Sequence, residues 1–336
     1  MKISIPVFFT AVFILLGGCA SQPTTNQPDW ITGDSASYKS AQYLLGRGQA
    51  ATQEDAKDRA RADLAKIFQV AVVASSEDVQ QFKSTGADAG QYASQSSRSI
   101  STRTEQIIRG IQIAELWQDP ASKNFHALAL LPRLQTAASL RQQIGQLDDA
   151  TGNHIAQSRG SSDLFLQIAA ANHALESQYE RDALQKSLQV VDITGRGVAA
   201  QWNPAKLKAD LDALLKRVRI APRVTADSTP GSAEIVAGAL AQAGYMIETG
   251  QNPDFILQAR MNLNDVGILE GWYWQRGTLE ITLSESANGR VRGTKRWDIK
   301  ASATDRENAI KRALGQADTI LKRELGGAII TMATGQ

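Results

Sequence analysis

A single cysteine, Cys19, limits how this chain can be stabilised. It has no partner for an intramolecular disulfide, so an ordinary hydrophobic core must hold the fold. Residues 1–2 are Met-Lys, and residues 3–16 form an apolar run that, at about 14 residues, is too short to cross a hydrocarbon core of about 30 Å. Because small residues follow this run directly, we expect residues 1–18 to be a signal peptide that is removed on export.

The end of this segment resembles the lipobox of bacterial lipoproteins. Leu16-Gly17-Gly18-Cys19 follows its pattern of leucine, a small residue, glycine and cysteine. The resemblance implies that the sulfur of Cys19 is diacylated and its amino group acylated, and three acyl chains would hold the protein on a membrane. A secretory signal with an incidental cysteine is the alternative. Ala20 stands where an acidic residue would indicate inner-membrane retention, so we expect the outer membrane, with the protein facing the periplasm or the cell surface.

Length and composition indicate a globular protein of more than one domain. The chain has 336 residues, and a single core seldom serves more than about 250–300. Its 36 basic and 34 acidic residues give a net charge of +2, which predicts no nucleic-acid partner. We expect an α+β fold of two small α/β domains with antiparallel sheets packed on helices, joined by a helical segment. The expected parts are a signal peptide at 1–18, a lipidated tether at 19–29, domains at 30–133 and 217–336, and a helical connector at 134–216.

The first domain begins with a predicted strand over Tyr43–Ala50, whose two glycines indicate close backbone approach. A helix follows, with a capping box of Thr52 and Asp55 and a face of small residues that would let it lie close to the sheet. Residues 54–60 of this helix share Glu, Ala, Arg and Ala in register with residues 307–313 near the end of the chain. Common ancestry of the two units and convergence of capped, alanine-rich helices both explain this match.

Further along the first domain, the β-branched and apolar run 68–73 predicts another strand. Residues 107–117 and 125–131 predict a β-hairpin. Residues 84–101 are rich in Ser, Gln, Gly and Ala, which suits either a loop or a polar extension of the flanking strands. The leucines, isoleucines and alanines of residues 134–191 recur at helical spacing and predict two or three helices.

A short helix with Asn203 as N-cap and Pro204 at its first position leads to a second predicted α/β unit. Strands are expected at 218–224, 255–263, 279–283 and 291–301, with a hairpin turn at Asn288-Gly289. Helices are expected from Pro230 or Ser232 to Gly244, and from a capping box of Thr304 and Glu307 to Gly326-Gly327.

Several of these motifs together resemble the Lpp-twenty family of bacterial lipoproteins over roughly residues 28–140. They are the start Pro28-Asp29-Trp30-Ile31, the glycine strand, the alanine-rich helix and the hairpin, in the family's order. The resemblance implies a compact α/β domain anchored to the outer membrane, with relatives that include flagellar outer-membrane assembly proteins P and T, and it brings no catalytic residues. The C-terminal unit is more weakly similar to lipoprotein activators of peptidoglycan synthases and to curli-secretion-type α/β domains.

The sequence contains no recognisable catalytic or metal-binding motif, so we expect no enzyme activity, cofactor or metal. Its three histidines, His126, His154 and His173, lack the spacing of metal ligands. Gly46-Arg47-Gly48 lacks the third glycine of a dinucleotide loop, and acidic residues begin the following helix, where they would repel a pyrophosphate.

Trp272-Tyr273-Trp274 is the cluster most suggestive of binding. Strand alternation would place Trp272 and Trp274 on one face and Tyr273 on the other, and such aromatics anchor protein interfaces or stack on sugars. The alternative is that they simply cover an open end of the sheet as part of the core. We expect an envelope assembly or scaffold factor that binds a protein partner or itself, with binding to cell-wall glycan (peptidoglycan) as the second hypothesis and an unfamiliar hydrolase as the third.

Overall fold

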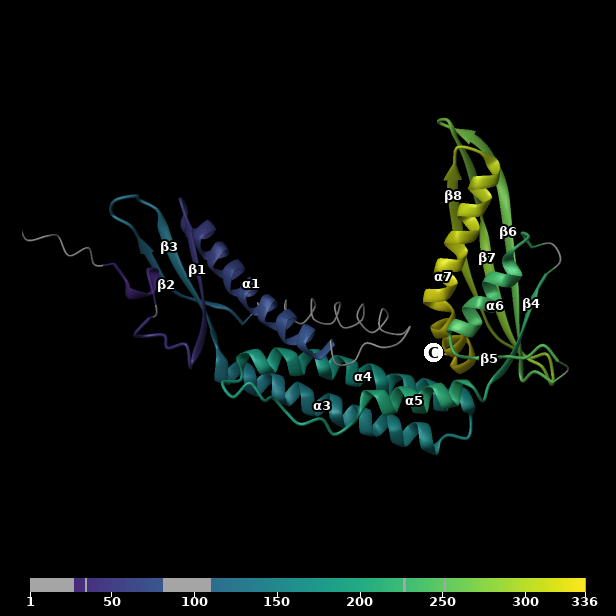
Figure 1. Cartoon of the computed structure of the whole chain (residues 1–336), viewed down its shortest axis with the longest axis horizontal. Coiled ribbons are helices and arrows are strands. Elements are labelled where there is room, and N and C mark those ends of the chain that lie inside the picture. The colour runs from purple at the N-terminus through teal and green to yellow at the C-terminus, as the bar shows by residue number, and fades with distance from the viewer. Residues whose placement is uncertain (1–26, 34, 81–109, 226–227, 251, 336) are drawn as a thin grey trace, which may run out of the picture.

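The computed structural model describes residues 27–33, 35–80, 110–225, 228–250 and 252–335. Two sheets, each with its own long helix, stand at the two ends of a layer of helices (Figure 1). This arrangement confirms the expected α+β fold. The predicted signal peptide at 1–18, Cys19 and residues 84–101 lie outside the described residues. Within the described residues, no helix is long and apolar enough to cross a membrane.

The N-terminal unit is a three-stranded antiparallel sheet with one helix packed against it. Its elements are η1 (Asp29–Ile31), β1 (Tyr43–Ala50), α1 (Gln53–Gln80), β2 (Gln112–Gln118) and β3 (Phe125–Pro132). The strand order is β1-β3-β2, so the predicted hairpin of β2 and β3 is confirmed, with β3 in the centre of the sheet. At the start of α1, the Asp55 amide donates to Thr52 Oγ1, which confirms the predicted cap.

The two glycines of β1 set the distance between sheet and helix. A Cβ placed on Gly46 would lie 2.5 Å from the carbonyl oxygen of Ala60, and one on Gly48 would overlap the carbonyl oxygen of Ala56. Ala56 and Ala60 are themselves fully buried. The predicted close approach is therefore a contact of helix backbone against strand backbone, which only small side chains allow.

The strand predicted at residues 68–73 is wrong, because α1 continues through this run. Leu64, Phe68 and Val72 are buried in the same core as Ala56 and Ala60, at four-residue intervals along one helix face. Burial at the helical period outweighs the β preference of the individual residues.

Three helices, α3 (Arg133–Gly160), α4 (Leu164–Val191) and α5 (Pro204–Leu215), form the middle of the molecule (Figure 1). The first two confirm the helices predicted over residues 134–191. In the third, Asn203 accepts hydrogen bonds from the amides of Ala205 and Lys206, as expected of an N-cap. The helix α4 belongs to both hydrophobic cores: Phe165, Ile168 and Leu175 lie in the C-terminal core, and Leu184, Leu188 and Val191 lie in the N-terminal core.

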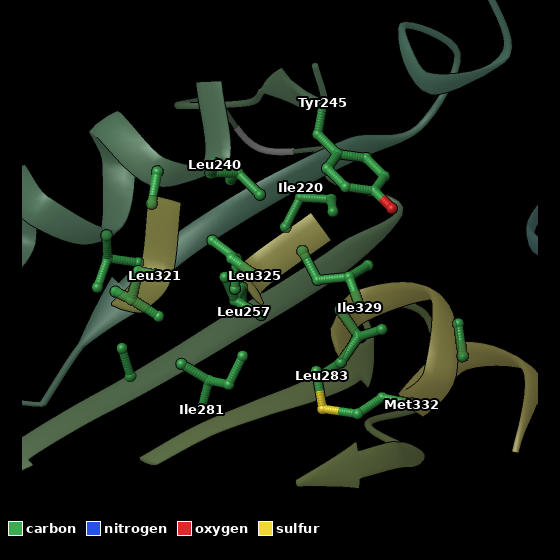
Figure 2. Close-up of a cluster of buried hydrophobic side chains, with 14 of the residues drawn as sticks. Ile220, Leu240, Tyr245, Leu257, Ile281, Leu283, Leu321, Leu325, Ile329 and Met332 are labelled. Atoms are coloured by element: carbon green, nitrogen blue, oxygen red, sulfur yellow. The ribbon is translucent and has the colours of Figure 1, made fainter. Parts of the chain in front are cut away.

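The C-terminal unit has a five-stranded sheet covered on one face by two helices that pack side by side (Figure 1). Its elements are β4 (Arg219–Val224), α6 (Ser232–Gln242), β5 (Met246–Ile247), β6 (Phe255–Leu269), β7 (Trp272–Glu285), β8 (Val291–Ala303) and α7 (Arg306–Thr334). The strand order is β5-β4-β6-β7-β8. The sheet is mixed, since β4 runs parallel to β5 and β6 while β6, β7 and β8 are antiparallel. Figure 2 shows the core between this sheet and its helices.

The last helix differs from the prediction at both ends. Its N-cap is Asp305, which accepts from the amide of Asn308, and not Thr304. The predicted end at Gly326-Gly327 is wrong, because α7 continues to Thr334. Leu325 and Ile329 are fully buried on either side of the glycines, and a Cβ on Gly326 would lie only 3.5 Å from Cβ of Ala243. Gly326 therefore lies where α7 meets the end of α6, and burial of the flanking residues sustains the helix.

Candidate functional site

The long hairpin of β6 and β7 carries the predicted aromatic cluster at its tip, at the end of the sheet away from α5 (Figure 1). Leu269 pairs with Trp272 across a two-residue turn. Both turn residues have positive φ, 53° at Glu270 and 80° at Gly271, as in the type I′ turns that suit the twist of β-hairpins. The strand β6 is six residues longer than its predicted extent of 255–263, so the tip lies well beyond the part that sequence alternation indicated.

A bulge in β6 explains why alternation ends early. The register shifts between Asp265 and Gly267, and the Asp265 carboxylate accepts a hydrogen bond from the amide of Gly267 at 2.9 Å. The same carboxylate forms an ion pair with Nε of Arg306 on α7 at 2.8 Å. The ion pair joins the bulge to the first turn of α7 and thereby orients the last turn of the hairpin.

Beyond the bulge, four large apolar side chains are exposed. Their exposed fractions are 40% for Val266, 59% for Ile268, 47% for Leu269 and 44% for Trp272. We call these four residues the apolar tip. Single exposed apolar residues are common on soluble proteins, but four within seven residues of one hairpin make this end of the sheet the candidate interaction surface. Of these four residues, only Trp272 was predicted from the sequence as part of a binding cluster, and the other three were not.

The predicted alternation of the aromatic triplet agrees with the pairing of β7. Trp272 and Trp274 occupy the strand positions that alternate with the buried Leu279 and Ile281, so they face away from α6 and α7, and Tyr273 faces the helix side. Lys300 Nζ on β8 lies 4.9 Å from the ring centroid of Trp274, which is cation–π distance. The lysine covers part of this ring, whereas Trp272 is free at the tip.

The free edge of the first sheet at β1 is occupied in part by side chains of α1. The amide of Arg47 donates to the Asp63 carboxylate at 2.9 Å. The carbonyl oxygen of Gln49 accepts from Nη1 of Arg59 at 2.7 Å. Two edge groups of β1 are therefore no longer available to pair with another strand.

The edge of the second sheet at β8 is occupied in the same way by α7. The amide of Lys300 donates to the side-chain oxygen of Gln316 at 3.0 Å. The carbonyl oxygen of Ser302 accepts from Nη1 of Arg312 at 2.7 Å. We call these two arrangements the edge clamps. The strand β2, at the opposite edge of the first sheet, is not covered by either clamp.

The histidines of the chain lie on three different elements in the part that the structure describes. No group of three or more His, Cys, Asp or Glu residues there is arranged to hold a metal ion. His154 and His173 lie together on α3 and α4 with ring centroids 5.4 Å apart, and His173 contacts Glu176 at 3.2 Å. His126 lies on β3, where its ring packs at 5.4 Å from that of Trp117.

The N-terminal sheet with its closely packed helix is similar to a family of lipoproteins. Residues 28–131 match the family model of the LPP20 lipoprotein, which confirms the resemblance found in the sequence. The match supports a lipoprotein role and membrane association through a lipid anchor. The likeness suggested for the C-terminal unit stays a prediction.

Among solved structures, a secreted protein from Helicobacter pylori is similar at 10% identity and a TM-score of 0.41, covering 83% of this chain and 96% of that one. A minor lipoprotein from Acinetobacter baumannii covers 35% of this chain and 91% of its own, at 12% identity and a TM-score of 0.26. A lipoprotein from Neisseria meningitidis covers 33% and 99%, at 13% identity and a TM-score of 0.24. All three scores are below 0.5, so these likenesses say nothing about function. No curated protein matches the sequence.

Proposed function

We propose that this protein is anchored by acylated Cys19 to the outer membrane and acts without catalysis, as an envelope assembly or scaffold factor. The observation that carries the proposal is the sharing of α4 between two cores. One continuous helix packed into both units fixes their separation, whereas domains joined by a flexible linker move independently. A fixed pair of binding units suits a protein that holds partners in register.

Two surfaces of the described residues would make contacts in the envelope, the first of them with protein. The first is the edge strand β2, whose open side would accept a strand of a protein partner or of a second copy of this chain. Leu116 on this strand is 37% exposed and supplies an apolar contact. The second surface is the hairpin end with Trp272, Tyr273 and Trp274.

The second hypothesis, binding of cell-wall glycan, has less support. Stacking of a sugar needs an open aromatic face, and Lys300 already lies over the ring of Trp274. Substitution of Trp272→Ala together with Trp274→Ala separates the two hypotheses. If the variant folds but no longer sediments with purified cell wall, the result supports the glycan hypothesis. If wild type and variant sediment alike, the glycan hypothesis is wrong.

The main proposal is tested by cross-linking in living cells. A photo-reactive amino acid replaces Leu116 on β2, and a matched control carries it at Leu134, which is 81% exposed on α3. We expect one envelope protein to cross-link at position 116 and not at 134, and the product to be lost with Cys19→Ala. Equal cross-linking at both positions, or products with bulk cell wall alone, would contradict the proposal.

A further inference from the structure

The face of the C-terminal sheet opposite α6 and α7 changes abruptly in character near the hairpin end. Leu269, Trp272 and Trp274 lie on this face at the tip, and the cross-strand pair Arg276 and Lys300 forms the next row. Membrane-bound proteins present their groups in the same order from the interior of a bilayer outward. Apolar side chains come first, then tryptophans at the interface, then basic residues. We infer that the apolar tip lies in the surface of a lipid bilayer and that Arg276 and Lys300 meet lipid phosphates.

The distribution of apolar groups at the tip favours lipid over a protein partner. The pair Leu269 and Trp272 lies on one face of the ribbon, and the pair Ile268 and Tyr273 lies on the other. A flat protein surface would cover one of these faces and leave the other in water. Lipid chains surround a protruding ribbon on all sides, so they remove both faces from water together.

The charges near the tip agree with a shallow position among the headgroups. In the part of the chain that the structure describes, Arg276 and Lys300 have no acidic partner, while Asp265 is paired with Arg306 and Glu280 with Arg296. The unpaired acids on this side are Asp298, which lies a further row from the tip, and Glu270, which lies in the turn itself. A carboxylate in the turn opposes deep end-on insertion, so the ribbon lies at a shallow tilt in the headgroup layer, where lipid contacts both of its faces and Glu270 stays hydrated.

This inference rests on the lipid-anchored part of the proposed function and not on its protein partner. Both sheets extend from the same side of the helical layer, so the start of the N-terminal unit and the tip can approach one membrane plane (Figure 1). A lipid anchor keeps the tip at a high effective concentration near the bilayer, so a weak second contact is enough to hold it there. Two contacts would hold the whole molecule in one orientation.

The test uses the full-length protein purified from membranes and reconstituted into vesicles of phosphatidylcholine and phosphatidylglycerol with brominated acyl chains. Bromine quenches tryptophan fluorescence at short range, and the chain has 6 tryptophans. We expect quenching by brominated vesicles, and we expect it to disappear in Trp272→Phe with Trp274→Phe. Substituting Ile268→Ser with Leu269→Ser should lower the equilibrium constant for insertion of the tip about a hundredfold, since each buried aliphatic side chain contributes about tenfold.

A matched control removes exposed apolar area elsewhere. Leu134→Ser with Ile193→Ser changes side chains that are 81% and 70% exposed and far along the chain from the hairpin, and it should leave quenching unchanged. Equal quenching in the tip variant and the wild type would overturn the inference, as would protection of Trp272 by purified cell wall or by an added protein but not by lipid. Failure of the protein to float with vesicles at all would instead contradict the lipid anchor, and so the proposed function.

Discussion

Arg59 and Arg312 occupy equivalent positions in the two units of the molecule. Each donates Nη1, at 2.7 Å, to the backbone carbonyl ten residues earlier, which belongs to Gln49 in one unit and Ser302 in the other. The other bond of each edge clamp also repeats. In each unit a strand amide donates to a side chain 16 residues later, from Arg47 to Asp63 in one unit and from Lys300 to Gln316 in the other. Two hydrogen bonds of matching spacing are not required by alanine-rich composition, so the geometry favours common ancestry of the two strand–helix units over convergence.

Loss of either clamp arginine should have the same effect. We expect Arg59→Met and Arg312→Met each to lower the free energy of unfolding by about 0.5–1.5 kcal/mol, because each removes one hydrogen bond to a strand edge. Urea denaturation measures this. Arg61→Met is the control on α1, since its ion pair with Asp58 is exposed and contributes less than about 0.5 kcal/mol. If all three substitutions lowered the free energy of unfolding equally, the edge clamps would not stabilise the fold more than an exposed ion pair does.

Gly48→Ala should disrupt the N-terminal unit. The new methyl group would occupy the space of the Ala56 carbonyl oxygen, so β1 and α1 would have to separate, at a cost of at least about 3 kcal/mol. The matched control is Gly145→Ala on α3, where nothing lies within 4 Å and helix propensity predicts a gain of about 1 kcal/mol. Circular dichroism during denaturation distinguishes the two, and a tolerated Gly48→Ala would mean that the sheet and helix are not in backbone contact.

The buried ion pair between α3 and α4 should be intolerant of single substitutions. Nε of Arg181 lies 2.8 Å from the Asp148 carboxylate, and the two side chains are 1% and 3% exposed. Arg181→Met leaves a buried carboxylate without its partner and should cost about 3–5 kcal/mol in unfolding free energy. Combining it with Asp148→Leu should recover more than half of that loss. Losses that simply add in the double variant would contradict the role assigned to the pair.

Acid should weaken the start of the second sheet. The hydrogen bond from the Arg219 side chain is the main cause that holds the pKa of Asp254 below its ordinary value of 3.8, helped by the Arg219 amide. Because the folded-state pKa is the lower one, this stabilisation is complete above 3.8 and is lost as the pH falls through the folded-state value. The free energy of unfolding, measured from about pH 6 down to about pH 2.5, should therefore fall less steeply in Asp254→Asn. Arg219→Met should flatten the profile in the same way, and an unchanged slope in both variants would refute the assignment.

Most elements could be predicted from the sequence because their local signals agree with their burial. The Asn203 cap, the Asn288-Gly289 turn and the glycines of β1 each specify one backbone geometry. The errors occurred where tertiary packing decides. Each of residues 68–73 favours a strand by its own preference, yet Phe68 and Val72 are buried at helical spacing. Glycine at position 326 is typical of a helix end when judged from the local sequence, but here it lies against Ala243.

The candidate site was visible only in part for a related reason. Trp272 and Trp274 could be identified from the sequence because tryptophan is typical of binding surfaces, and their common face follows from the alternation of side chains along a strand. Val266, Ile268 and Leu269 lie past a bulge that breaks the period of two, so no pattern joined them to the aromatic cluster. The pairing of Asp265 with Arg306, 41 positions later in the sequence, depends on where α7 begins and has no local signal.

The shared helix α4 also gives the molecule a fixed internal length. Its 28 residues, at 1.5 Å each, span about 42 Å, and both ends are set in packed cores. A partner that binds both sheets at once must therefore present its two contact points at a distance set by the length of α4. Deleting seven residues from the middle of α4 and from the facing part of α3 would shorten this interval by about 10 Å while turning the two units by only about 20°, so distance could be varied almost independently of direction.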